Sequence, residues 1–173
     1  SGPGAPAEPA PAPRPTAAAA GNAPPSLPPP ATDAKGLTEA LDWALAQNSD
    51  AASPYFGRID PTAIAVSGYS CGGLQALQVA ADPRVKTLVI MNSGLFNEGT
   101  SRIPGMNVPK SRLNDIHSPT FYILGGETDI AYKNGMDDFA RISHVPVFMG
   151  NLVGVGHGGT YWQPNGGKAA AAV

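Results

Sequence analysis

The sequence lacks the features that mark several protein classes. With one cysteine in 173 residues, it holds neither an intrachain disulfide framework nor a cysteine-rich zinc site. Its purely apolar runs reach at most five residues, whereas a membrane-spanning helix needs roughly 20. The 11 basic residues are scattered and are balanced by 13 acidic ones. The resulting net charge of −2 provides no basic surface for nucleic acid or for an anionic membrane.

Charge is also scarce, while glycine and proline are abundant. Charged residues make up 14% of the chain, against about 25% in typical globular domains. Eleven of the 19 prolines and ten alanines fall in residues 1–31, a segment that cannot bury enough surface to offset the entropy of ordering it. We therefore expect residues 1–31 to be a disordered Pro/Ala-rich segment, either a natural linker or a sequence remnant. Residues 32–173 are expected to form the folded domain.

Beyond this segment, helical and strand-like apolar spacing alternate along the chain. Helical spacing occurs in residues 33–48, 71–82 and 132–139, with Thr32 or Asp33 as the expected cap of the first helix. Short apolar runs typical of strands occupy residues 64–67, 88–91, 120–124 and 145–149. Run 88–91 is apolar on both faces, as in a parallel sheet. The alternation predicts an α/β fold with about four mainly parallel strands and flanking helices.

One short motif connects this pattern to chemistry. Residues Gly68-Tyr69-Ser70-Cys71-Gly72 match G-x-S-x-G and lie between an expected strand and an expected helix. In that context the motif is typical of a sharp turn that holds a nucleophilic serine in a strained conformation, which requires small flanking residues. Ser70 is therefore the candidate nucleophile, and the backbone N–H of Cys71 is the candidate oxyanion donor. The alternative is a polar residue that simply begins a helix.

A nucleophilic serine needs a base, and the base needs an orienting acid. His157 lies in a glycine-rich loop after strand 145–149, and Asp129 follows strand 120–124. Both candidates thus come just after the C-terminal ends of strands, where open α/β sheets bind their ligands. The chain order Ser70, Asp129, His157 is also the order that accompanies this type of turn.

Other interpretations of these residues remain open. Asp129 could cap the helix that follows it, in which case Glu127 is the remaining candidate acid. His117 and His144 are expected to have structural roles. The thiol of Cys71 has no basic neighbour to activate it, so its side chain is expected to serve packing. No residues have the spacing of a metal site, and we expect neither a metal nor a cofactor.

Residues from about 33 to 167 resemble the C-terminal half of the α/β-hydrolase superfamily. The resemblance rests on Gly68–Gly73, Gly126–Asp129, the loop of His157 and the segment 82–85. It is closest to the esterase, dienelactone-hydrolase-like and polyester-hydrolase-like branches. It implies a partial α/β-hydrolase fold in which Ser70 is the nucleophile, His157 the general base and acid, and Asp129 the group that orients His157.

The same resemblance implies an enzyme that cleaves carboxylic esters, of small molecules or of polymers, through an acyl-enzyme intermediate. Tyr69, Phe96 and Trp162 are the expected substrate-binding side chains, although packing would explain them equally well. The spacer and the resemblance together favour a secreted or periplasmic location.

The sequence departs from the family pattern ahead of residue 33. Members of the family place several strands before the serine turn, and a loop among those strands supplies the second oxyanion donor. Residues 1–31 offer only a proline-rich spacer there, so we expect weak activity. We also expect an open sheet edge beside strand 64–67, through which the chain could self-associate. The alternative is a non-catalytic module with a structural or interaction role.

Overall fold

The computed structural model describes residues 30–97 and 103–158 of the chain. Of the segment 1–31, which is expected to be disordered, residues 1–29 lie outside this part of the chain, as does Trp162, an expected substrate-binding residue. Within them the elements run in the order α1 (Lys35–Ser49), β1 (Ile64–Tyr69), α2 (Cys71–Gln78), β2 (Val85–Met91), the 3-10 helix η1 (Lys110–Asp115), β3 (Thr120–Leu124), α3 (Tyr132–Arg141) and β4 (Val147–Asn151). Among these elements, no helix has the length and apolarity that crossing a membrane requires.

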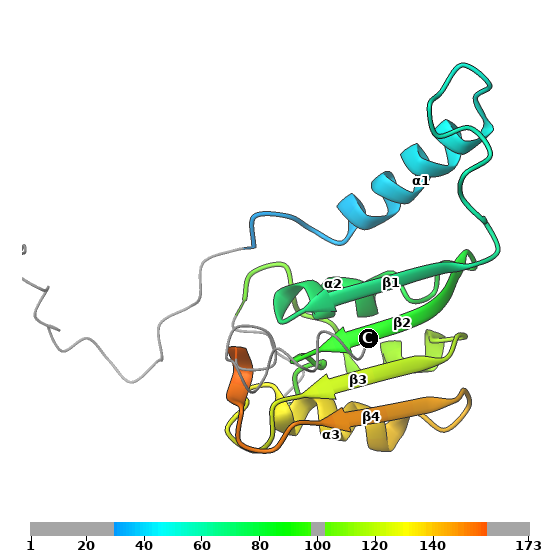
Figure 1. The fold of residues 1–173 in the computed structure, drawn as a ribbon. Helices are drawn as coiled ribbons and strands as arrows, with labels where there is room; N and C mark the ends of the chain where they lie inside the picture. Colours follow the sequence, from blue (N-terminus) through cyan, green and yellow to red (C-terminus); the bar gives the residue numbers. More distant parts are fainter. Residues whose placement is uncertain (1–29, 98–102, 159–173) are drawn as a thin grey trace, which may run out of the picture.

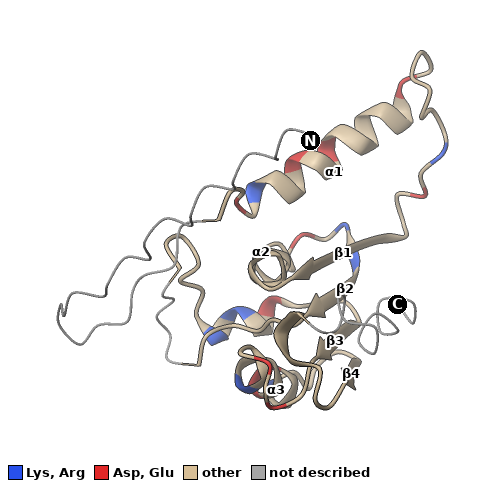
Figure 2. Cartoon of the chain, turned by 60° about the vertical axis from the view of Figure 1, so that its left-hand side comes forward, with Lys and Arg blue, Asp and Glu red and all other residues tan. Residues whose placement is uncertain are grey.

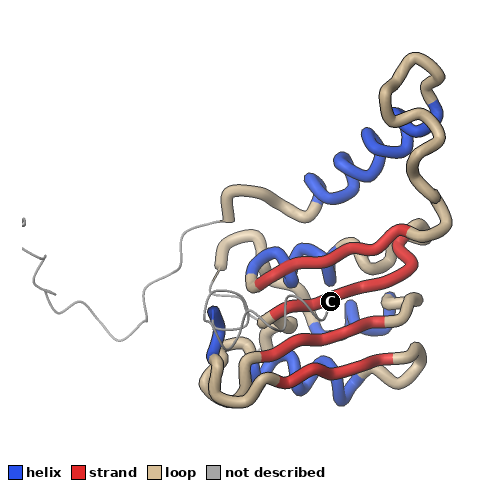
Figure 3. The backbone as a smooth tube through the Cα atoms, viewed as in Figure 1, coloured by secondary structure: helices blue, strands red, loops and turns tan. Residues whose placement is uncertain are grey.

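The strands form one sheet in the order β1-β2-β3-β4, and each neighbouring pair is parallel. All four strands therefore end on the same side of the sheet (Figure 1; Figure 3). The expected α/β fold with four parallel strands is confirmed. Of the described strands, β1 pairs only with β2, so it lies at a sheet edge as expected. Self-association through that edge stays a prediction.

The strand bounds differ from the expected ones at both ends, since β2 begins three residues earlier than expected, at Val85, and β4 begins two residues later, at Val147. β3 has the expected bounds, whereas β1 runs two residues further, to Tyr69, and β4 runs to Asn151. These extra residues are the ones that lead into the loops at the C-terminal side of the sheet. Their backbone stays paired with the next strand, Tyr69 opposite Met91 and Leu124 opposite Asn151. The loops that follow therefore start from fixed positions.

The core lies on one face of the sheet. Leu88, Ile90 and Tyr122 of the central strands are fully buried there, and α2, η1 and α3 pack over them. On the opposite face Phe121 is half-buried and its neighbour Phe148 is 61% exposed. The described elements thus fully cover only one of the two apolar faces that the sequence indicates.

Helix α1 has the expected periodicity but buries none of its residues. It extends away from the sheet (Figure 1), and its exposed Trp43 makes an edge-on contact with Tyr55. The helix begins at Lys35, later than expected, although Asp33 accepts a hydrogen bond from the Gly36 N–H as a capping residue does. Acidic and basic residues are spread over the helices and loops, in keeping with the small net charge (Figure 2).

A buried carboxylate ties α3 to the sheet and to the loop after β2. Asp138 has no exposed surface, and one of its oxygens accepts hydrogen bonds from the Leu95 N–H (2.7 Å) and the Tyr122 hydroxyl (3.3 Å). Its other oxygen accepts a hydrogen bond from Lys110 of η1. Burial raises the pKa of Asp138 to about 6, although these donors oppose the rise. The carboxylate fixes the loop that leads to Phe96.

This raised pKa gives a prediction for stability. The folded state holds the Asp138 proton more tightly than the unfolded state, whose carboxyl titrates near 4. Between pH 4 and pH 6 the contribution of Asp138 to the unfolding free energy should therefore fall as pH rises, by about 1–3 kcal/mol. We expect that the wild type loses this amount relative to Asp138→Asn in denaturant titrations across the interval. Parallel stability curves for the two proteins would contradict the assignment.

Candidate active site

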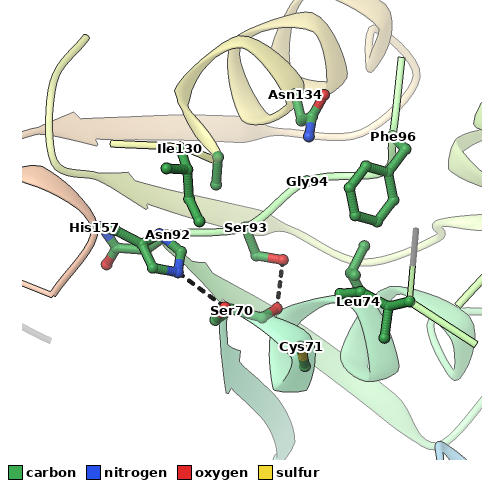
Figure 4. Close-up of a pocket in the computed structure, with 12 residues that line it drawn as sticks. Ser70, Cys71, Leu74, Asn92, Ser93, Gly94, Phe96, Ile130, Asn134 and His157 are labelled. Atoms are coloured by element: carbon green, nitrogen blue, oxygen red, sulfur yellow. Dashed lines mark hydrogen bonds between the residues drawn. The ribbon is translucent and has the colours of Figure 1, made fainter. Parts of the chain in front are cut away.

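Ser70 occupies the turn between β1 and α2 in a backbone conformation that non-glycine residues rarely adopt. Its φ of 53° and ψ of −117° are held by hydrogen bonds from the Gly73 and Leu74 N–H groups to its carbonyl oxygen, at 3.0 and 3.2 Å. The hydroxyl of Ser93 donates a third bond to the same oxygen at 2.7 Å (Figure 4). Strain of this kind persists only where the surroundings impose it, and it is frequent at functional sites.

The sequence predicts that small residues must flank this turn, and that prediction is confirmed at one flank only. A Cβ on Gly68 would lie 2.1 Å from the Gly72 carbonyl oxygen, and one on Gly73 would lie 2.4 Å from the Cβ of Ser93. A Cβ on Gly72 would meet nothing within 4 Å. The prediction for Gly72 was therefore wrong, because it is Gly73, the next residue, that packs against the loop after β2.

The structure brings Ser70, His157 and Asp129 into one hydrogen-bonded chain. The Nε2 of His157 lies 2.9 Å from the Ser70 Oγ, and its Nδ1 lies 2.7 Å from Asp129 Oδ1. A carboxylate only accepts, so Nδ1 carries the proton and Nε2 is free to accept one from the serine hydroxyl. The three residues come from the ends of β1, β3 and β4, which the parallel sheet places together.

Asp129 accepts four hydrogen bonds. Oδ1 accepts hydrogen bonds from the His157 ring N–H at 2.7 Å and the Ala131 backbone N–H at 2.9 Å. Oδ2 accepts hydrogen bonds from the Asn92 side-chain amide at 2.7 Å and the Gly125 backbone N–H at 3.0 Å. Burial alone would raise its pKa, but these donors outweigh burial and hold the pKa below the usual value. The alternative interpretation of Asp129 as a helix cap was wrong, because Ala131 is the capping residue of α3; the bond from the Ala131 N–H only connects Asp129 to the start of that helix.

Sequence reasoning missed Asn92. It follows β2 directly, is completely buried and has a positive φ of 45°. A buried amide needs partners, and its Nδ2 donates to Asp129 Oδ2. The available signal was its place after an apolar strand, at the same edge of the sheet as Ser70 and Asp129.

Glycines also position the loop that carries His157. The Gly156 N–H donates to the Gly125 carbonyl oxygen at 2.8 Å. A Cβ on Gly125 would lie 2.0 Å from the Gly156 carbonyl oxygen, so the two loops approach backbone to backbone. The hydroxyl of Tyr69 donates to the His157 carbonyl at 2.9 Å, and its ring lies beside the imidazole with centroids 5.2 Å apart.

The remaining candidates divide between the site and the periphery. Phe96 lines a cavity next to Ser70, whereas the structure places Tyr69 against His157; the role of each in binding substrate stays a prediction. Glu127 is exposed. His117 and His144 contact the backbone carbonyls of Asp82 and Ile116, as structural residues do. The described residues contain no cluster of three side chains able to hold a metal ion.

The contrast between the two glycines of the motif can be tested by substitution. Gly68→Ala should lower the unfolding free energy by about 2 kcal/mol or more, since the new methyl group would overlap a backbone carbonyl that cannot move freely. Gly72→Ala is the matched control, because it has open space in a helix and should gain up to about 1 kcal/mol. Denaturant titration measures both changes, and equal losses would contradict the steric account.

Matches to known proteins were found among solved structures only. No protein-family model matches the sequence, and a search of curated proteins gave no match. The structure is similar to an acylaminoacyl peptidase of Pyrococcus horikoshii, with a TM-score of 0.62 and 10% identity over 80% of this chain and 25% of that one. It is similar to the esterase domain of a Rhodothermus marinus protein, with a TM-score of 0.58 and 16% identity over 82% of this chain and 69% of that one.

A third match is a Klebsiella pneumoniae protein assigned as a dienelactone hydrolase, with a TM-score of 0.57 and 14% identity over 80% of this chain and 57% of that one. The chain thus spans a quarter of the peptidase and just over half of the Klebsiella protein. At these identities the likeness shows the fold. The four parallel strands and their flanking helices form part of an α/β-hydrolase fold, the architecture that the sequence resemblance implies.

Proposed function

We propose that the protein is a serine hydrolase that cleaves carboxylic esters through an acyl-enzyme. The observation that carries the proposal is the hydrogen-bonded chain from Ser70 Oγ through His157 to Asp129. Its three members come from separate strand ends, and Ser70 stands on a strained turn. Packing or solubility would need neither the shared geometry nor the strain. The likeness to a peptidase and an esterase domain supports acyl transfer as the reaction class.

The chemistry follows from the positions of the donors and acceptors. His157 Nε2 takes the proton from Ser70 as Oγ attacks the ester carbonyl carbon, and Asp129 stabilises the resulting imidazolium. The carbonyl oxygen becomes an oxyanion. The backbone N–H of Cys71, at the start of α2, can donate a hydrogen bond to it. His157 then returns the proton to the leaving alcohol. A water molecule, activated by the same nitrogen, hydrolyses the acyl-serine.

The four donors on Asp129 have a defined task in this mechanism. An ionised carboxylate is needed to fix the Nδ1–H tautomer of His157, and the low pKa of Asp129 keeps it ionised well into the acid range. Asn92, Gly125 and Ala131 also prevent the carboxylate from rotating away from the imidazole. Asn92 is thus a positioning residue that acts through Asp129.

Ser70→Ala tests the nucleophile. A fluorophosphonate probe should label the wild-type protein at Ser70, and the variant should lose both labelling and hydrolysis of p-nitrophenyl acetate. Loss of the serine in such a triad lowers turnover by up to about 10⁶. Far-UV circular dichroism should be unchanged, because the substitution removes one hydroxyl at a half-buried position.

A probe that still labels the variant, or ester hydrolysis that survives it, would refute the assignment of Ser70. A wild-type protein that folds but neither reacts with the probe nor hydrolyses esters would favour the non-catalytic alternative.

Asp129→Asn tests the acid, with Glu127→Gln as the matched control. Both replace a carboxylate by its amide in the same turn, but only Asp129 contacts His157, while Glu127 is exposed. Asp129→Asn should lower turnover by about 10⁴, because an amide there favours the wrong imidazole tautomer. Glu127→Gln should leave turnover within about twofold of the wild type. The opposite pattern in ester assays would move the acid role to Glu127.

A further inference from the structure

A cavity of about 140 Å³ opens beside Ser70, between the start of α2, the loop after β2 and the start of α3. Its walls are mainly apolar and include Leu74, Phe96, Ile103 and Ile130. Ser70 and His157 lie at one end of it, so a molecule bound to the serine would extend into this space (Figure 4).

The position of His157 indicates which part of an ester the cavity receives. The imidazole must protonate the leaving alcohol, so that part of the substrate lies on the His157 side of Ser70. Figure 4 shows Leu74 and Phe96 on the other side of the serine. The acyl part is the one that remains on that side, so the part of the cavity lined by Leu74 and Phe96 faces the acyl group.

The volume limits what can enter. An apolar cavity of about 150 Å³ holds one benzene molecule. The cavity beside Ser70 has nearly the same volume, about 140 Å³. The loop that forms one wall is fixed by the bond from the Leu95 N–H to the buried Asp138, and Leu74 on the other wall is 4% exposed. These two walls are held in place, so a bound group must fit between them.

A single polar group faces this space from α3. The Oδ1 of Asn134 accepts a hydrogen bond from the Asn97 N–H at 3.3 Å, which fixes the orientation of the amide. Its nitrogen end then points into the cavity towards Ser70 (Figure 4). Among the described residues, that nitrogen has no hydrogen-bond acceptor, so it can donate to an oxygen atom of a bound acyl group.

We propose that this cavity is an acyl pocket for a short acyl group, no larger than one aromatic ring, whose far end carries an oxygen that accepts a hydrogen bond from Asn134. The proposal rests on the proposed ester hydrolysis at Ser70. It adds to that function the size and the polarity of the acyl group, and the proposed function and the acyl pocket can be refuted separately.

The size limit is tested on the wild type with p-nitrophenyl esters of 2 to 12 acyl carbons. The value of kcat/KM should rise about fourfold per methylene while the chain fills the cavity. Beyond about six carbons it should fall by at least about tenfold, since a filled pocket rejects further methylenes. Varying the alcohol of butyrate esters should have a smaller effect. A maximum at eight or more carbons, or a stronger dependence on the alcohol, would overturn the proposal.

Phe96→Ala tests the wall, with Phe148→Ala as the matched control on an exposed position of β4. Phe96→Ala should move the optimum to acyl groups longer by two carbons or more, whereas Phe148→Ala should leave it unchanged. Thermal unfolding of each variant shows that it is folded at the assay temperature. An unchanged optimum in folded Phe96→Ala would contradict the assignment of the cavity.

Asn134→Asp tests the polar end, because it keeps an oxygen for the Asn97 N–H and removes the donor. The substrates are p-nitrophenyl 4-oxopentanoate and 4-methylpentanoate, which have the same shape but differ in a carbonyl oxygen. The ratio of their kcat/KM values should fall by about tenfold in the variant, the value of one hydrogen bond. An unchanged ratio would show that Asn134 does not contact the acyl group.

The two proposals give separable results. Absence of Ser70-dependent hydrolysis of every ester would refute the proposed function itself. Hydrolysis that depends on Ser70 but is indifferent to acyl length and to Asn134 would refute the acyl pocket alone.

Discussion

The Asp129 carboxylate is the point on which the arrangement of the site depends. It joins the end of β2 through Asn92, the end of β3 through Gly125, the start of α3 through Ala131 and the loop after β4 through His157. A buried charge with fewer donors would take up a proton and release the imidazole. Four partners from four segments keep it ionised, and in doing so they fix those segments relative to one another.

Backbone contacts do the remaining positioning. Gly68 lies so close to the Gly72 carbonyl oxygen in the first turn of α2, and Gly125 to the Gly156 carbonyl oxygen after β4, that neither leaves room for a side chain. Hydrogen bonds between main-chain atoms hold these contacts, as between Gly156 and Gly125. Main-chain contacts of this kind have fewer degrees of freedom than side-chain contacts, so the imidazole and the serine hydroxyl meet at 2.9 Å without long flexible linkages.

The sequence predicted the parts of this structure that depend on local pattern. Ser70, Asp129 and His157 each follow a strand-like run, and parallel pairing then places all three ends at one edge. Asn92 and Asp138 could not be predicted in the same way, because their roles depend on which segments pack against them. Helix α1 shows the converse: its periodicity predicted the helix but not its burial, since burial requires a partner that periodicity does not specify.

Helix α3 links the chemistry of the site to the shape of the cavity. Asp129 supports its first turn through Ala131, Asn134 faces the cavity, and Asp138 holds the loop that forms the opposite wall. A rotation of this helix would displace the acid and the cavity wall together. The buried bonds of Asp138 to Tyr122 and Lys110 oppose that rotation. The proposed acid and the proposed acyl pocket therefore share one support, although Asp129 precedes α3 and Asn134 lies within it.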